Sequence, residues 1–280
     1  MSDIVFERVG RRFVRDGREI PALEDVSFHV ADREFVAIVG PSGCGKTTCL
    51  RMAAGLEFPS GGRVLVGGRE VRGPGPDRSV VFQQFALFPW KSVRENIDFG
   101  LRATGVAAGE RRSRIERYIG LMGLQGYESA FPHQLSGGMQ QRVAIARSYA
   151  LDPEVLLMDE PFGALDAQTR VVMQEELVKL ARGNPRTVLF ITHSVEEAVY
   201  LADRVVVMTR RPGRVGEVVD VAAVREAERW GRHERIEDVM DEDSFVHLRT
   251  RIWRLLREQQ ADAAHREAEE PTHQPGGDGP

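Results

Sequence analysis

The sequence predicts an α/β fold with a mainly parallel core sheet, an antiparallel β side layer and a helical subdomain. Three observations predict it. Short apolar runs rich in Val, Ile and Phe alternate with helical patterns, as in proteins built on a parallel sheet. A glycine-punctuated run at 61–71 is typical of a hairpin. Between about 85 and 150 the strand pattern fades and helical patterns dominate.

The expected strands fall into two groups. They are IVFERV (4–9), VSFHV (26–30), FVAIV (35–39), VLLMD (155–159), TVLFIT (187–192) and RVVVM (204–208). The first two join the hairpin at 61–71 in the antiparallel side layer. The other four form the core sheet, where apolar runs such as VLLM suit strands that are buried on both faces.

The helical region at about 85–150 contains three expected helices. Ser92 and Glu95 form a capping-box pattern before an amphipathic stretch. A second helix is expected over 110–124, and a third begins within QLSGG at 134–138. A helical insert in an α/β core predicts a subdomain that can move as a body.

The chain divides into a first domain over 1–225, a C-terminal helical extension over 226–258 and an acidic tail over 259–280. In the extension, apolar residues recur at helical spacing among arginines: Phe245, Leu248, Ile252 and Leu255. We interpret this stripe as a helix face packed on the core rather than a contact with anionic lipid. The tail lacks apolar content and is predicted to be disordered.

Composition narrows the function classes. With 280 residues and 42% hydrophobic content, the chain can bury a full core. Its net charge of -4 equals that of 259–280, where five acids face one arginine, so the rest is neutral and gives no sign of a nucleic-acid binder. No apolar run is long enough to span a membrane, and no signal peptide precedes the fold, so we expect a cytoplasmic chain. Cys44 and Cys49 have no metal-ligand spacing.

GPSGCGKT, at 40–47, fits the phosphate-binding pattern G-x-x-x-x-G-K-[ST] in full, directly after a strand and before a helical run. Its residues are Gly40, Pro41, Ser42, Gly43, Cys44, Gly45, Lys46 and Thr47. The glycines let backbone N–H groups surround a phosphate. Lys46 is expected to reach the outer phosphates and Thr47 to hold Mg²⁺. A plain glycine turn is the alternative, but the flanking strand and helix favour a P-loop nucleoside triphosphatase (P-loop NTPase).

Four further polar residues are candidates for the site, and three of them lie at the ends of predicted core strands. Asp159 and Glu160 end VLLMDE, where Asp159 would bind Mg²⁺ and Glu160 would orient or deprotonate the attacking water. His193 ends TVLFIT and would donate to the γ-phosphate. Gln83 ends SVVFQ and would bind Mg²⁺ or the attacking water. Taken singly, each has a structural alternative such as a helix cap or an inert surface side chain.

A second phosphate cradle is predicted at LSGGM, residues 135–139. Ser136 can cap the following helix, while Gly137 and Gly138 leave backbone N–H groups open to a ligand. An ordinary N-cap after a loop is the alternative. The ordered set of motifs, with GALD and ITH downstream, favours the functional interpretation.

Over residues 3–220 this set resembles the ATP-binding subunit of ATP-binding cassette (ABC) transporters. By resemblance, 40–48 matches the Walker A loop, which adds Thr48, and 135–139 matches the signature. Gln83 matches the Q-loop, Asp159 the Walker B aspartate, Glu160 the catalytic carboxylate, Asp166 the D-loop and His193 the switch histidine. Phe13 matches the aromatic residue, typically Tyr, that stacks on adenine in this family, with a core position as its alternative.

The resemblance implies ATP and Mg²⁺ as cofactors and a homodimer in which each signature closes over the other copy's ATP. It also implies two transmembrane permease subunits, and a periplasmic or lipid-anchored solute-binding protein acting through them, at the cytoplasmic face of the membrane. Residues 73–102 and 209–215 look most like bacterial importers of nitrate, sulfonates and taurine. An ABC-type ATPase acting on DNA or ribosomes is the alternative, and the neutral charge of 1–258 disfavours it.

Overall fold

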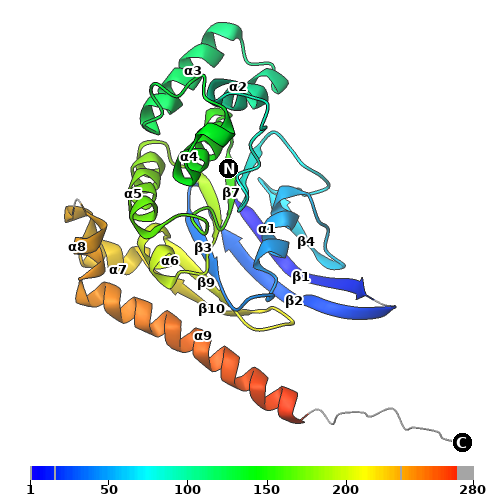
Figure 1. The fold of residues 1–280 in the computed structure, drawn as a ribbon. Helices are drawn as coiled ribbons and strands as arrows, with labels where there is room; N and C mark the ends of the chain where they lie inside the picture. The colour runs from blue at the N-terminus through cyan, green and yellow to red at the C-terminus, as the bar shows by residue number, and fades with distance from the viewer. Residues whose placement is uncertain (1, 16, 234, 270–280) are drawn as a thin grey trace, which may run out of the picture.

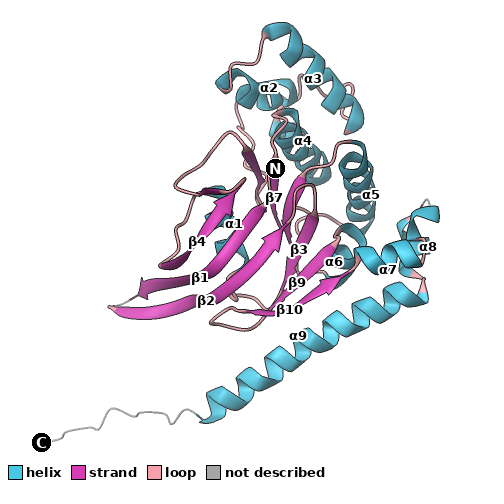
Figure 2. Cartoon of the chain, turned by 180° about the vertical axis from the view of Figure 1, so that it is seen from behind, coloured by secondary structure: helices cyan, strands magenta, loops and turns pink. Residues whose placement is uncertain are grey.

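The computed structural model describes residues 2–15, 17–233 and 235–269, which form two sheets surrounded by helices (Figures 1 and 2). Helices α2, α3 and α4 gather at one end of the molecule, and the long helix α9 lies at the opposite end (Figure 1). The fold class predicted from the sequence is confirmed. Among the described residues, no helix has the length and apolarity needed to cross a bilayer.

The core sheet has six strands in the order β10-β9-β3-β8-β7-β6. They are β3 (Phe35–Val39), β6 (Arg78–Val81), β7 (Val155–Asp159), β8 (Thr187–Ile191), β9 (Arg204–Met208) and β10 (Val215–Asp220). All neighbours pair in parallel except β10 with β9. Every residue of β3, β7 and β8 is buried, as the continuous apolar runs require.

The sequence interpretation missed the two outer strands of this sheet. β6 is only four residues long, and β10 carries a glycine and two acids, so neither presents a continuous apolar run. Both lie at sheet edges, where one side of the strand has no neighbour. Edge strands need less burial than central ones, which is why their sequences gave a weaker signal.

The side sheet is antiparallel, in the order β2-β1-β4-β5. Its strands are β1 (Ile4–Arg15), β2 (Arg18–Val30), β4 (Gly61–Val66) and β5 (Arg69–Glu70). β1 and β2 extend well beyond the short apolar runs at 4–9 and 26–30, because their exposed ends pair with each other from Arg11 to Arg18.

Two apolar cores lie on the two faces of the core sheet. Val36 and Ile38 of β3 face the side sheet and helix α1 (Lys46–Ala54). Ala37 and Val39, which alternate with them, face α4, α5, α6 and α9. The helices on this second face are α5 (Ala167–Gly183), α6 (Val195–Leu201), α7 (Ala222–Ala227), α8 (Ile236–Met240) and α9 (Asp243–Glu269), besides α4.

The helical region holds α2 (Val93–Ala103), α3 (Ala108–Leu121) and α4 (Gly137–Ala150). The capping box at α2 is complete, with Ser92 Oγ accepting from the Glu95 N–H and Glu95 accepting from the Ser92 N–H. Helix α3 was expected over 110–124, but it ends at Leu121. Gly123, at φ +59°, turns the chain out of the helix, and such a conformation is easiest for glycine.

Helix α9 differs from its sequence-based description in two ways. The buried stripe is Phe245, Leu248, Ile252 and Leu256, whereas the predicted Leu255 is only half-buried. The helix also continues to Glu269, so the part of the predicted disordered tail over 259–269 is helical. Ala, Glu, Gln and Arg dominate that segment, and these residues favour helix even without apolar contacts. The remainder of the predicted tail, 270–280, lies outside the described residues.

The packing of α9 gives the first prediction. Phe245 is fully buried with its ring 5.5 Å from that of Trp230, whereas Trp253 is 42% exposed. Phe245→Ala should therefore cost about 3–5 kcal/mol of unfolding free energy in urea, and Trp253→Ala about 0.5 kcal/mol or less. Equal costs for the two substitutions would show that the stripe does not pack on the core.

Candidate active site

The loop at 40–48 joins the end of β3 to the start of α1, and two of its glycines are required by geometry. Gly43 and Gly45 have φ of +76° and +98°. A Cβ at Gly45 would lie 2.3 Å from a methyl carbon of Leu23, and one at Gly40 would lie 2.8 Å from Cys44 Sγ. A side chain would not fit at either position, and a glycine-rich turn between a strand and a helix N-terminus is typical of a phosphate site. Burial raises the pKa of Cys44, which keeps its thiol protonated.

Lys46 lies across this loop. Its Nζ donates to the carbonyl oxygens of Gly40, at 2.8 Å, and Pro41, at 3.1 Å, and the residue is 5% exposed. Among the described residues no carboxylate forms an ion pair with Lys46. A buried ammonium held by carbonyl oxygens and without such an ion pair suits the binding of an anionic group, because burying an unpaired charge is otherwise costly.

Thr47 and Asp159 supply adjacent oxygen atoms at the ends of α1 and β7. Thr47 Oγ1 donates to Asp159 Oδ1 at 3.1 Å. Burial raises the pKa of Asp159, although the Thr47 hydroxyl and the charges of Arg51 and Lys46 oppose the shift. Hydroxyl and carboxylate oxygens are the ligands that Mg²⁺ prefers, so these two residues fit the ion.

Two predicted residues, Gln83 and His193, contact the carboxylate of Glu160. Its Oε2 accepts from Gln83 Nε2 at 3.1 Å, and its Oε1 lies 2.5 Å from His193 Nε2. Glu160 itself has φ +48°, an uncommon value for a residue with a side chain, and its N–H donates to Ile191 O at 2.9 Å. The backbone is therefore held in a sparsely populated conformation that places the carboxylate between the ends of β6 and β8.

The second cradle lies at the exposed start of α4. Ser136 caps this helix, with its hydroxyl accepting from the Met139 N–H at 3.3 Å. The two glycines differ: a Cβ at Gly137 would meet open space, whereas one at Gly138 would lie 2.4 Å from a methyl carbon of Thr169. Gly137 thus leaves backbone open, and Gly138 allows α4 to approach α5 closely.

Asp166 caps α5 and is exposed. Its two carboxylate oxygens accept from the Thr169 N–H at 3.0 Å and the Thr169 hydroxyl at 2.7 Å. These bonds, the backbone one first, lower the pKa of Asp166 and keep it ionised.

Phe13 lies on β1 opposite Ile20, half-buried and outside both apolar cores. The Arg11 guanidinium lies 4.7 Å from the centre of its ring. An aromatic ring beside a guanidinium suits stacking of a flat base, so the core alternative for Phe13 is not supported.

Sequence reasoning gave no role to Gly213, which supports the phosphate loop. Its N–H donates to Ala22 O at 2.9 Å and its carbonyl accepts from the Glu24 N–H at 3.0 Å. A Cβ there would lie 1.8 Å from Cys44 O, so only glycine fits against the loop. The dipeptide PG at 212–213 marks a turn, but nothing local in the sequence shows what the turn packs against.

Comparison with known proteins decides the family. A profile described as ABC transporter matches residues 23–163, half of the chain. The chain belongs to the ABC transporter family. It is an ATPase cassette, and the family predicted from the sequence motifs is confirmed.

Relatives of this ABC cassette include proteins named for import. It is 49% identical over 207 residues to a nitrate import ATP-binding protein of Synechocystis sp., covering 74% of this chain and 78% of that protein. It is 47% identical over 242 residues to a taurine import ATP-binding protein of Rhizobium johnstonii, covering 86% and 91%. A solved dimeric ATP-binding cassette in a post-hydrolysis state, bound to ADP and Pi, matches with TM-score 0.70 and 31% identity over 78% of this chain and 98% of that one.

The raised pKa of Asp159 gives a prediction about stability. Asp159→Asn should raise the melting temperature of the nucleotide-free protein at pH 7.5 by roughly 2–4 °C, which is about 1 kcal/mol in a chain of this size. Burial disfavours the ionised carboxylate in the folded state, and the amide removes that cost. The gain should shrink as the pH falls through the raised folded-state pKa of Asp159. It should be lost below the unfolded value of about 4, where the wild-type carboxyl group becomes protonated in both states.

Asp166→Asn is the matched control. Hydrogen bonds from Thr169 lower the pKa of Asp166, so folding favours its ionised form and the amide should give no rise at pH 7.5. A fall in melting temperature for Asp159→Asn would contradict the burial argument.

Proposed function

We propose that this chain is the ATP-hydrolysing subunit of a bacterial ABC importer and acts as a homodimer in which each copy completes the other's nucleotide site. The observation that carries the proposal is the presence of two separate phosphate cradles, one at 40–48 and one at the exposed start of α4. Within the described chain no hydrogen bond joins them. The dimeric solved cassette and the import proteins among the relatives support the same arrangement.

In this proposal the phosphates of ATP lie in the loop at 40–48, with Lys46 on the outer phosphates and Phe13 against adenine. Ser136, Gly137 and Gly138 of the second copy close over the same nucleotide. Each ATP then binds better to the closed dimer than to the open one, which is the differential affinity that a conformational switch requires.

Hydrolysis depends on the groups around Glu160. Glu160 orients or deprotonates the attacking water, and its contacts with Gln83 and His193 hold the carboxylate in position. His193 donates to the γ-phosphate, and Asp166 lies at the interface with the second copy. Mg²⁺, held by Thr47 and Asp159 with Gln83 as a further oxygen ligand, would neutralise charge on the phosphate oxygens.

We place the permease against an exposed aromatic patch that follows Gln83. Trp90 is 70% and Phe99 is 45% exposed, and the ring of Phe88 lies 4.5 Å from that of Phe99. Arg147 of α4 donates to Ala86 O at 2.8 Å and Phe85 O at 3.3 Å, so the segment after Gln83 is tied to the helix that Ser136 begins. Exposed apolar patches mark protein interfaces.

Two transmembrane permease subunits would hold the homodimer at the cytoplasmic face of the membrane. A periplasmic or lipid-anchored binding protein would recognise the solute through the permease, and the chain itself would not touch it. The solute class, nitrate, taurine or a similar small solute, rests on the names of the relatives.

A cassette acting on DNA or ribosomes is the alternative. Such a cassette would carry a very long insertion between the two phosphate-binding motifs, or a basic surface. Only ninety residues separate Lys46 from Ser136, which leaves no room for such an insertion. The neutral charge outside the tail likewise disfavours it.

The homodimer proposal predicts which lesions share a site. A mixed dimer with Ser136→Arg in one copy and Lys46→Ala in the other should place both lesions on one composite site. The second site stays intact, so the dimer should retain one ATP after rapid gel filtration.

The matched control places the same two lesions in one copy, paired with an unmodified copy. Each composite site then carries one lesion, and ATP retention should fall toward zero. The reverse pattern would mean that Ser136 acts within its own chain.

A further inference from the structure

Glu197 does not form the capping box that its position in the sequence predicts. Ser194 and Glu197 have capping-box spacing at the start of α6, like Ser92 and Glu95 at α2. At α2 both halves of the box form and Glu95 is exposed. At α6 only one half forms: Ser194 Oγ accepts from the Glu197 N–H at 3.2 Å, but the Ser194 N–H donates to Thr192 Oγ1 at 3.0 Å instead.

The Glu197 carboxylate is instead buried, with the residue 5% exposed. Thr192 Oγ1 donates to its Oε2 at 2.5 Å, and the Arg170 Nε lies 3.7 Å from its Oε1. The buried Gln174, one turn further along α5, also opposes the rise in the pKa of Glu197 that burial causes. Burying a carboxylate costs free energy even with such partners, and an exposed cap would have avoided that cost.

These contacts connect two catalytic segments. Thr192 directly precedes His193, and its hydroxyl bonds both Glu197 and the Ser194 N–H, so the backbone is held on both sides of His193. On the other side, Arg170 Nη2 donates to Leu165 O at 2.9 Å, and Leu165 directly precedes Asp166. One buried carboxylate thus links the segment of His193 to the segment of Asp166.

We infer that Glu197 is a positioning residue for ATP hydrolysis, which fixes His193 relative to Glu160 and ties that geometry to the loop of Asp166. The inference rests on the roles proposed above for His193 and Glu160. Glu197 touches no reacting group itself. It acts through Thr192 and Arg170, and small displacements of a catalytic group are enough to lower turnover substantially.

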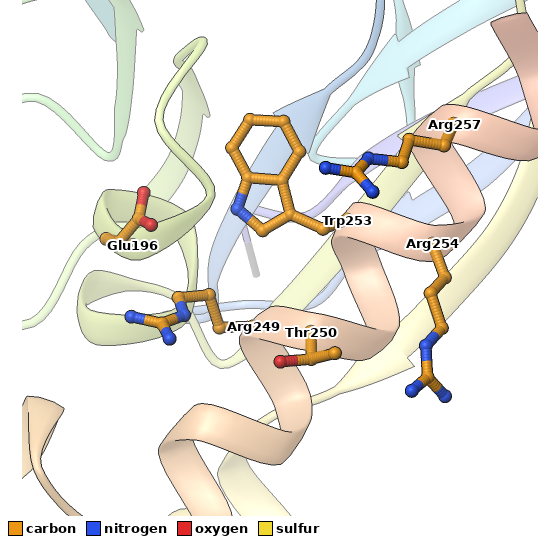
Figure 3. A pocket seen from close by; sticks show the side chains of 6 residues that line it. All are labelled: Glu196, Arg249, Thr250, Trp253, Arg254 and Arg257. Carbon is orange, nitrogen blue, oxygen red and sulfur yellow. The ribbon is translucent and has the colours of Figure 1, made fainter.

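Glu196 supplies a matched control in the adjacent position. Figure 3 shows its carboxylate on the outer side of α6, beside a hollow of about 390 Å³ that is also lined by Arg249 and Trp253 of α9. The Glu196 carboxylate accepts a hydrogen bond from the Ser194 hydroxyl at 3.2 Å. Glu196→Gln removes the same charge one residue away without cutting the link.

The test measures kcat and KM for ATP, and the melting temperature, on the full chain. Glu197→Gln, which weakens the hold on Arg170, and Thr192→Val, which removes the hydroxyl, should each lower kcat about ten-fold or more. KM should stay within about two-fold, because the loop at 40–48 is untouched. Thr192→Ser should restore turnover, and Glu196→Gln should match the wild type.

A merely structural role for Glu197 predicts a different result. In that case Thr192→Val and Glu197→Gln would lower the melting temperature while the folded fraction kept its kcat, and this outcome would overturn the inference. Because Gln replaces the buried charge with an isosteric neutral group, we expect Glu197→Gln to fold. If it did not, the comparison of Thr192→Val with Thr192→Ser would decide alone.

His193→Ala separates this inference from the proposed function. Full activity in His193→Ala would overturn the role proposed for His193 and the inference with it. Loss of activity in His193→Ala together with normal kcat in Glu197→Gln would overturn the inference alone.

Discussion

The parallel pairing of β3, β8, β7 and β6 determines the rest of the site, because the carboxyl ends of parallel strands lie at one edge of the sheet. Gly40 follows β3 directly, and Glu160 follows β7. His193 and Gln83 each lie two residues beyond their strands, β8 and β6. Thr47 and Asp159, whose side chains are separated by 112 positions, thereby meet within hydrogen-bonding distance. An antiparallel neighbour at any of these positions would send one of them to the opposite edge.

The site at this edge is held in an arrangement that is unfavourable without a ligand. Lys46 is buried among carbonyl oxygens, burial opposes ionisation of Asp159, and Glu160 has a positive φ. Each feature costs free energy in the isolated chain, and in the proposed function each would be relieved or used on binding of a phosphate and a divalent cation. Glu197 extends this pattern to a buried carboxylate outside the site itself, since the neighbours that offset its charge include Thr192 and Arg170, which also hold the segments of His193 and Asp166.

The sequence was most informative where the chemistry is local. The glycine loop, the Ser92 cap, the Ser136 cap and the buried run of β7 all depend on residues within a few positions of one another. Tertiary packing determined the rest. β6 and β10 are strands because they pair at the sheet edges. The packing of α9 on the core buries Leu256 rather than Leu255. The Glu197 carboxylate contacts Thr192 and Arg170 instead of completing the helix cap. Gly213 shows the same limit, because its close contact with Cys44 joins segments far apart in the chain.

The central claim is that two copies of this chain share each ATP. It is tested most directly by the molar mass of Glu160→Gln in saturating Mg-ATP, measured by light scattering. Blocking hydrolysis while the loop at 40–48 still binds ATP should trap a dimer, and adding Lys46→Ala to the same chain should return it to a monomer. A Glu160→Gln chain that remains monomeric in saturating Mg-ATP would contradict the account.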